Sequence, residues 1–140
     1  MACDFCNSSE IEERMIIKND LMMAFPTNIP VAPGHVLLCP VRHAAKFENL
    51  TKQEIEALFD IQLKLKTVLM KAFSAEGFNF AWNEGKSAGQ EINHFHMHMI
   101  PRTKNDSNVD PRNFLYRTQQ RPKLGKDELR SITNTIRKFL

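Results

Sequence analysis

The segment at positions 94–100 constrains the fold more than any other part of the chain, because histidines alternate in it with large apolar residues. It runs His-Phe-His-Met-His-Met-Ile. Successive side chains of a β-strand point to opposite faces, so a strand places the three histidines on one face and Phe95, Met97 and Met99 on the other. A helix would scatter the histidines around its axis. The pattern therefore predicts a strand whose apolar face meets a core and whose histidines face solvent.

The length and composition predict one domain. A chain of 140 residues, 42% of them hydrophobic, can build one core and is too short for two ordinary domains, so we expect a single domain at 1–140. No apolar run approaches the roughly 18 residues that cross a membrane, and the first residues lack the features of a secretion signal. These observations predict a cytoplasmic protein without a membrane partner.

The cysteines and the charges narrow the possible partners. Three cysteines, an odd number, argue against a disulfide framework. Cys39 lies in an apolar run and is expected to be buried, whereas Cys3 and Cys6 need another role. The net charge is only +3, although residues 101–140 hold ten Lys or Arg against four Asp or Glu. Few aromatic residues are interleaved with these basic residues, so nucleic acid is not a favoured partner.

Hydrophobic periodicity predicts an α+β fold with an antiparallel sheet of about five strands. A hairpin is expected between residues 11 and 25, and further strands at 35–39, 78–82 and 94–100. Thr51 and Glu54 have the spacing of a capping box, and apolar residues follow at helical intervals as far as Gly77, which predicts one long helix packed across the sheet.

The last forty residues are predicted to form an arm and a helix and to add no strand to the sheet. Residues 101–125 are polar and contain prolines, which predicts an exposed arm. Leu129, Ile132, Ile136 and Phe139 recur at helical spacing, so a short amphipathic helix is expected at 126–140.

The histidine strand supports two chemical interpretations. A His-x-His strand can offer two imidazoles to one zinc ion. Alternatively, a neutral imidazole can attack phosphorus and form a phosphoramidate, which makes one histidine a nucleophile. Gln90 and Asn83 stand just upstream, where their neutral amides could hold phosphate oxygens.

The same residues resemble a known signature. The run His94-x-His96-x-His98 with two apolar residues after it and Ala-Gly-Gln at 88–90 before it is similar to that of the histidine triad family of nucleotide hydrolases and transferases. The likeness covers about residues 3–102. Residues 33–58 most resemble the fragile-histidine-triad branch, whereas the Cys-x-x-Cys at the N-terminus is more like the zinc-containing prokaryotic branch.

The resemblance implies substitution at the α-phosphate of a nucleotide. By match to the family's middle histidine, His96 would be the nucleophile and would form a nucleotidyl-imidazole that water resolves. His98 would hold phosphate oxygens and assist the leaving group, and neutral donors would stabilise the developing charge. The implied substrate-binding residues are Gln90, Asn83, His35, Thr27 and Phe5. For His35, the plainer interpretation is a strand-end histidine bonded to backbone.

The resemblance also assigns the two N-terminal cysteines. Members with this motif bind zinc through both thiolates, a histidine of the loop after the third strand and the first triad histidine, which here are Cys3, Cys6, His43 and His94. Two thiolates and two imidazoles close a tetrahedral site, so the implied zinc is structural. Two departures concern the substrate: Thr27 stands where the family has an Asp or Asn near ribose, and Glu91 stands where many members have Ser or Thr, so we leave Glu91 out of the site.

Three functions remain open at this stage. The leading one is an enzyme that releases a nucleoside monophosphate from a dinucleoside polyphosphate or a nucleoside phosphoramidate, with adenine as the default base. The second is a nucleotide-binding regulatory or scaffold protein with little turnover. The third is a metal-binding module that uses all three histidines. The family also implies a homodimer.

Overall fold

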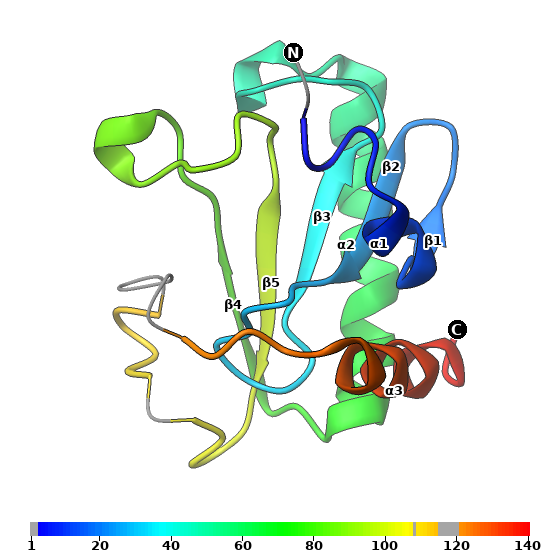
Figure 1. The fold of residues 1–140 in the computed structure, drawn as a ribbon, viewed down its shortest axis with the longest axis vertical. Helices are drawn as coiled ribbons and strands as arrows, with labels where there is room; N and C mark the ends of the chain where they lie inside the picture. The colour runs from blue at the N-terminus through cyan, green and yellow to red at the C-terminus, as the bar shows by residue number, and fades with distance from the viewer. Residues whose placement is uncertain (1–2, 108, 115–120) are drawn as a thin grey trace.

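The protein is a five-stranded antiparallel sheet with one long helix on one face (Figure 1). A computed structural model describes residues 3–107, 109–114 and 121–140. The sheet order is β1-β2-β3-β5-β4. The strands are β1 (Ile17–Lys18), β2 (Met22–Pro26), β3 (Val36–Pro40), β4 (Gly77–Ala81) and β5 (Met97–Arg102). The helices are α1 (Ser9–Glu13), α2 (Lys52–Phe73) and α3 (Lys126–Arg137), with 3₁₀ turns at Phe47–Asn49 and Lys86–Ala88. The predicted α+β class is confirmed.

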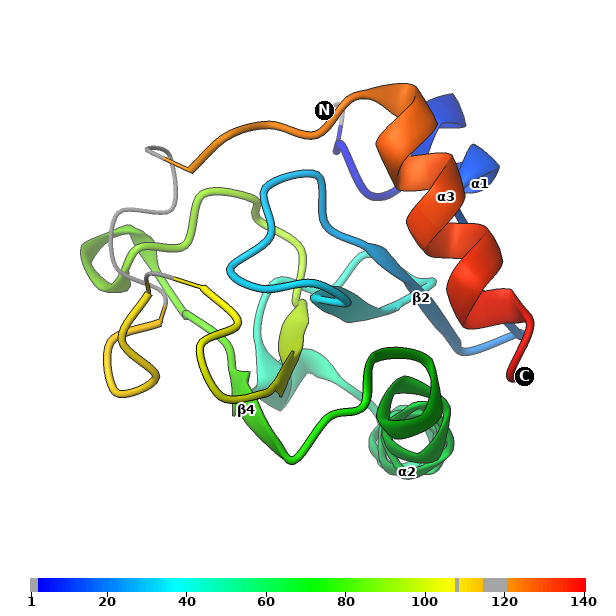
Figure 2. The same ribbon diagram turned by 90° about the horizontal axis from the view of Figure 1, so that it is seen from below.

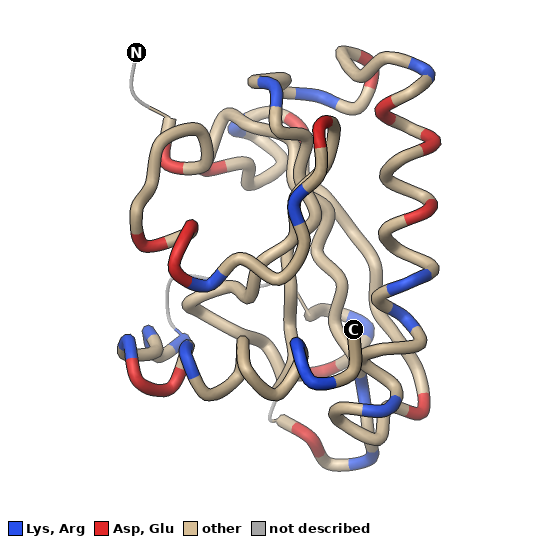
Figure 3. Tube along the Cα trace, turned by 90° about the vertical axis from the view of Figure 1, so that its right-hand side faces the viewer, with Lys and Arg blue, Asp and Glu red and all other residues tan. Residues whose placement is uncertain are grey.

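The long helix α2 begins where the sequence predicts. The Thr51 side chain accepts from the Glu54 N–H, and the Glu54 carboxylate accepts from the Thr51 N–H, which completes the capping box. After Lys52, the acidic residues of α2 precede its basic residues (Figure 3), an order that suits the helix dipole. The helix ends at Phe73, because Ser74 adopts a left-handed conformation with φ of 54°.

Both faces of the central strands are covered. Along β2, Met22 and Ala24 belong to the core under α2, whereas Met23 and Phe25 belong to a second cluster on the opposite face. Figure 2 shows α2 on one side of the sheet and the N-terminal segment with α1 on the other. Cys39 is buried in the second cluster, as expected. No helix of the described residues is long and apolar enough to cross a membrane.

The hairpin predicted for residues 11–25 starts later than expected, because its first residues belong to a helix. The chain forms α1 at Ser9–Glu13, because the Ser8 hydroxyl accepts from the Ile11 N–H and caps the helix. The hairpin itself is present, with β1 antiparallel to β2. The Asn19 side chain closes the turn by accepting from the backbone N–H groups of Leu21 and Met22.

The histidine segment keeps its alternation but is neither all strand nor open to solvent. Strand β5 begins only at Met97, so His94 and His96 precede it. Phe95, Met97 and Met99 lie in the core under α2, as predicted. The opposite face is covered by the N-terminal segment: the Phe5 ring lies 5.7 Å from the His94 ring and 5.1 Å from the His96 ring, centroid to centroid. His94 is therefore fully buried, and the expectation of solvent-facing histidines is wrong.

The described part of residues 101–125, which is predicted to form an exposed arm, contacts the body at several points, while its side chains at 104–105 and 110–113 are exposed. Pro101 and Arg102 end strand β5, and Val109 and Phe114 pack against a small cluster around Ile100. The Leu124 N–H donates to the Asn28 carbonyl. Residues 108 and 115–120 of the predicted arm lie outside the described residues.

The C-terminal helix is shorter than predicted. Helix α3 ends at Arg137, and its buried residues are Leu129, Thr133 and Ile136. Phe139, which was expected on the apolar face, is 44% exposed. Phe139, the last residue of the apolar repeat, lies two residues beyond the end of α3.

A nearly buried ion pair anchors the segment after β5. The Arg102 guanidinium donates to both oxygens of Asp106, at 2.9 and 3.0 Å, and their side chains are 13% and 7% exposed. Removing Asp106 leaves a buried cation, so Asp106→Ala should lower the free energy of unfolding by about 3 kcal/mol. Urea denaturation measures this. The matched control is Asp110→Ala, which breaks the exposed pair with Arg112 and should change stability by less than about 1 kcal/mol. Equal losses in the two variants would contradict the expectation.

Candidate active site and metal centre

The ring of His96 is held with a free nitrogen in a cleft. Its Nδ1 lies 2.8 Å from the His94 carbonyl oxygen, and because a carbonyl only accepts, Nδ1 carries the proton. Nε2 therefore keeps its lone pair. Burial lowers the pKa of His96, and the bond to the carbonyl only partly opposes this, so the ring is neutral near pH 7. His96 can thus act as a nucleophile through Nε2.

A chain of hydrogen bonds orients His98. The Val31 N–H donates to His35 Nδ1 at 3.0 Å, so the His35 proton sits on Nε2 and is donated to His98 Nδ1 at 2.9 Å. The proton of neutral His98 is then on Nε2, and the ring, 5.2 Å from that of His96, can donate to a substrate oxygen. His35 bonds to backbone, as in the plainer interpretation; it does not line the cleft and meets the site only through His98, so its role in substrate binding stays a prediction.

The glycine before His35 allows the His35 ring to come within hydrogen-bond distance of His98. Gly34 has φ of 89°, and a Cβ there would lie 2.7 Å from the Phe73 ring and 2.8 Å from Pro101. Only glycine fits this position without displacing α2 or β5. The turn that delivers His35 to His98 therefore depends on it.

The histidine pair is kept neutral. Burial, followed by the nearby His98 ring, lowers the pKa of His35 well below its ordinary value of 6.5. Burial, with smaller contributions from His96 and Arg121, lowers the pKa of His98 to about 3. The site can therefore offer a phosphate uncharged donors but no imidazolium cation at neutral pH.

This neutrality predicts a dependence of stability on pH. Below pH 6.5 an unfolded histidine gains a proton that folded His35 and His98 do not bind, so stability is full above pH 6.5 and falls as the pH is lowered. Each histidine contributes up to about 1.4 kcal/mol per pH unit. Urea unfolding between pH 6.5 and 5 measures the slope. His35→Gln should have a slope smaller by about one proton; because its metal ligands are unchanged, an equal slope would contradict the assignment.

The predicted amides both line the cleft, but one is largely engaged by the protein. The Gln90 side chain accepts from the Gly85 N–H and donates to the Ala45 carbonyl. It therefore has at most one N–H left for a phosphate oxygen. Asn83 lines the same cleft and lies close to Gly89. Gln90 is better described as a brace for the 85–90 loop than as a free phosphate donor.

The rest of the cleft wall combines predicted and unpredicted residues. Phe5 and Thr27 line it, and the Thr27 hydroxyl accepts from the Ile29 N–H. Glu91, which the sequence reasoning left out, lines it too. Arg14 was missed: it is 8% exposed, and its Nε donates to the Pro26 carbonyl. No local signal could have found it, since an arginine after three glutamates is typical of a solvated surface.

The four predicted metal ligands come together. One ligand atom from each of Cys3, Cys6, His43 and His94 lies within 4.8 Å of all the others. His94 Nε2 donates to the Pro40 carbonyl, so its Nδ1 lone pair faces the two sulfurs, at 3.4 and 3.5 Å. Two thiolates and two imidazoles at this separation fit a tetrahedral metal ion after a small contraction. His96 and His98 are outside this cluster of the described residues, which argues against one metal held by all three triad histidines.

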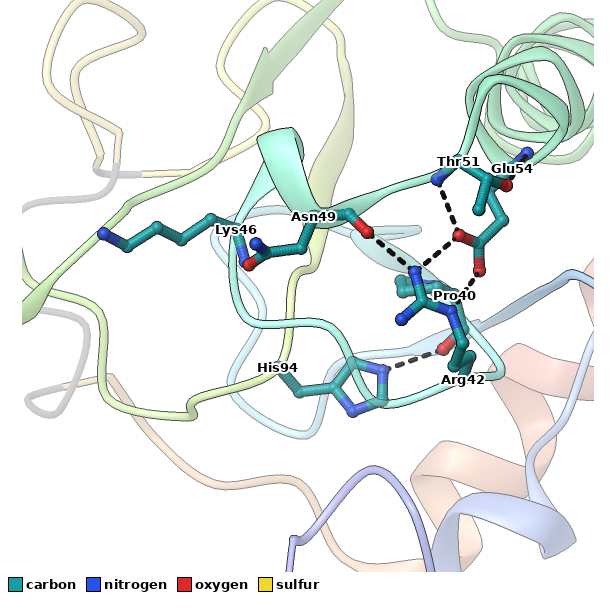
Figure 4. Close-up of polar contacts among 7 residues, drawn as sticks. All are labelled: Pro40, Arg42, Lys46, Asn49, Thr51, Glu54 and His94. Carbon is teal, nitrogen blue, oxygen red and sulfur yellow. Dashed lines mark hydrogen bonds and ion pairs between the residues drawn. The ribbon is translucent and has the colours of Figure 1, made fainter.

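A bidentate ion pair fixes the loop that carries His43. The Arg42 guanidinium donates to both oxygens of Glu54 and to the Asn49 carbonyl (Figure 4). Glu54 also caps α2, so the loop that carries His43 is tied directly to the long helix. Figure 4 also shows His94 bonded to Pro40.

The metal cluster and the cleft share one residue. His94 faces the sulfurs with its ring, and its carbonyl accepts from His96 Nδ1. The backbone at His94 thereby sets which nitrogen of His96 is free. Ligation of His94 would hold this backbone in place without entering the chemistry.

Comparison with known proteins identifies relatives along most of the chain. A sequence model of the HIT domain matches residues 8–105. A bis(5'-adenosyl)-triphosphatase of Dictyostelium discoideum is 37% identical over 95 residues, which are 68% of this chain and 64% of that protein. An adenosine 5'-monophosphoramidase of Saccharomyces cerevisiae is 33% identical over 77% of this chain and 67% of that protein. The chain thus spans about two thirds of the length of these relatives.

The fold also matches solved structures. A zinc-bound histidine triad family protein from Mycobacterium smegmatis superimposes with a TM-score of 0.73 over 99% of this chain and 92% of that one, at 19% sequence identity. This likeness establishes a common fold.

Proposed function

Because this chain belongs to the histidine triad (HIT) family, we propose that it is a nucleotide hydrolase that attacks the α-phosphate of its substrate through His96. The observation that carries the proposal is the pairing of a free Nε2 on His96 with an outward N–H on His98 in one cleft. Relatives named as a triphosphatase and a phosphoramidase support it.

The reaction has two displacements. His96 Nε2 forms a bond to the α-phosphorus as the bond to the leaving group breaks, and the leaving group departs with the bonding electron pair. Water then attacks the phosphorus of the nucleotidyl-imidazole and gives up a proton to the solvent. The P–N bond breaks, its electron pair returns to His96 Nε2, and the nucleoside monophosphate leaves. His98 Nε2–H donates to the phosphate oxygens in both steps, where a preorganised donor lowers the barrier.

The substrate is a dinucleoside polyphosphate or a nucleoside phosphoramidate. Both present the same phosphorus to His96 and differ in the leaving group. Phe5, Leu37 and Ile92 form an apolar part of the cleft suited to a purine, with adenine as the default base. A panel of diadenosine triphosphate, diadenosine tetraphosphate and an adenosine phosphoramidate tests this. If none is hydrolysed, the nucleotide-binding regulatory protein becomes the better hypothesis.

The metal is proposed to be zinc with a structural role. The ligand set is two thiolates and two imidazoles, which zinc favours, and four protein ligands leave no open position for substrate. The zinc-bound relative from M. smegmatis supports this assignment. A metal held by thiolates suits a reducing compartment, and we propose a cytoplasmic location, which cell fractionation would test.

The protein is proposed to form a homodimer through the edge of its sheet. Strand β4 is the last strand in the order and pairs only with β5 among the described strands. Phe80 on β4 and the nearby Trp82 are partly exposed. An open edge strand can pair with a second copy. Sedimentation velocity showing a monomer at micromolar concentration would refute this.

A further inference from the structure

The two terminal nitrogens of Arg121, an arginine close to the cleft, are buried and have no hydrogen-bond partner among the described residues. Arg121 donates from Nε to the Ile29 carbonyl at 3.1 Å. These terminal nitrogens are the only buried side-chain polar atoms of the described residues in this condition. Buried polar groups are rarely left unpaired, and a buried cation without an anion is especially costly.

Arg121 is bonded to a residue of the cleft wall but does not itself line the cleft. Ile29 and Asn28 line the cleft together with His96 and His98. Arg121 is bonded to Ile29, and Leu124 is bonded to Asn28, so the segment entering α3 is fastened along this wall. The positive charge of Arg121 contributes to the lowered pKa of both His98 and His35. Arg121 therefore lies directly behind the cleft-lining residue Ile29 and close to His35 and His98, the pair that would orient the donor to the phosphate.

Among the described residues, no carboxylate forms an ion pair with Arg121. Positions 115–120 contain no Asp or Glu. The histidines of the cleft are neutral. Arg14 lines the cleft and keeps its charge, but its Nε and Nη1 donate to the Pro26 and Glu10 carbonyls, so it has only Nη2 left for a phosphate oxygen, whereas Arg121 has both terminal nitrogens. A triphosphate or tetraphosphate bridge carries several negative charges, and the leaving group keeps most of them. The cleft needs a cation for that part of the substrate, whereas a phosphoramidate needs none.

We propose that Arg121 binds the phosphate chain of the leaving group and so makes the site selective for polyphosphates over phosphoramidates. This rests on the proposed function, because it requires the α-phosphate to sit against His96 and His98. The next phosphate then extends past Ile29, and the Arg121 guanidinium turns from behind that residue so that its two terminal nitrogens donate to the phosphate. Charge-assisted bidentate bonds of this kind are among the strongest hydrogen bonds in proteins.

The test compares two substrates in Arg121→Gln and in a matched control. The variant keeps a side chain that can donate to Ile29 but removes the charge. The ratio of kcat/KM for diadenosine triphosphate to kcat/KM for an adenosine phosphoramidate should fall by at least about tenfold. Arg112→Gln removes a charge from an 89% exposed side chain of the same basic region and should leave the ratio unchanged. Thermal unfolding verifies that both variants fold.

The outcomes separate this proposal from the proposed function. If kcat/KM falls equally for the two substrates in Arg121→Gln, or falls for neither, the proposed role of Arg121 is refuted. The proposal that the protein is a hydrolase is then unaffected. If the wild type hydrolyses neither substrate, the proposed function fails, and calorimetric titration with inorganic tripolyphosphate still tests Arg121. Binding should then weaken at least about tenfold in Arg121→Gln and not in Arg112→Gln. Equal binding by the wild type and Arg121→Gln would overturn the proposal.

Discussion

Replacing His96 with asparagine is expected to lower kcat/KM for diadenosine triphosphate by at least about a thousandfold. The asparagine amide can still donate toward the His94 carbonyl, which preserves the local hydrogen bond, but it has no nitrogen lone pair able to attack phosphorus. The loss should therefore appear in kcat, with the Tm little changed. Steady-state assays and thermal unfolding of the same preparations measure both effects.

The covalent step can be observed directly. Acid-free rapid quenching of the wild type during turnover should give a peptide containing His96 that is heavier by one nucleotidyl group, and His96→Asn should give none. Asn93→Ala is the control, because Asn93 is exposed and lies in the same segment. Wild-type turnover by His96→Asn, or an adduct on another residue, would contradict the assignment of the nucleophile.

Removing the metal is expected to destabilise the protein strongly. The four proposed ligands would tie the N-terminus to the loop after β3 and to the histidine segment, so most of the binding energy of a metal there would act as folding energy. A loss of about 4 kcal/mol corresponds to a fall in Tm of roughly 10 °C for a chain of this size. Dialysis against a chelator, followed by calorimetry, measures the change, and zinc should restore it.

Ligand variants test which histidines hold the metal. Cys6→Ser and His43→Ala should reduce the zinc content from one ion per chain to a small fraction, whereas His98→Ala should retain it. Elemental analysis by mass spectrometry gives the content. Zinc loss in His98→Ala comparable to that in His43→Ala would show that the triad and the metal cluster are not separate. Full retention in Cys6→Ser and His43→Ala would refute the cluster.

Loss of the metal should also lower the activity, because the backbone at His94 links the metal ligands to His96. Its ring faces the sulfurs and its carbonyl orients His96, so apoprotein that still folds should lose activity together with its metal.

Much of the fold was predictable because its signals are local. The alternation at 94–100 placed Phe95, Met97 and Met99 in the core, and the spacing of Thr51 and Glu54 placed the start of α2. These features depend on neighbours a few residues apart, where backbone geometry alone sets which side chains share a face. The errors were local as well: α1 replaced the first part of the hairpin once Ser8 capped it, and Phe139 lies beyond the end of α3.

The residues of the site were predictable from the sequence, but the tautomers of its histidines were not. Family resemblance named the triad and the four metal ligands, which come from segments up to 91 residues apart. Which nitrogen of each histidine carries the proton depends on the carbonyls of His94 and Pro40 and on the N–H of Val31. A buried imidazole takes the tautomer that its fixed neighbours impose, and those neighbours are set by packing.

The sequence by itself therefore determined the strand pattern, the long helix and the identity of the three histidines, since each is written in short-range spacing. Only the tertiary structure decided that His94 and His98 are buried while His96 stays partly exposed, and that the three divide into one that faces the cysteines, one with a free nitrogen and one that donates. It also brought Arg14 into the cleft wall, placed Arg121 behind the lining residue Ile29, and engaged Gln90 in bracing a loop. Charge and hydrogen-bond partners in a buried site are set by contacts between distant segments, which no local pattern contains.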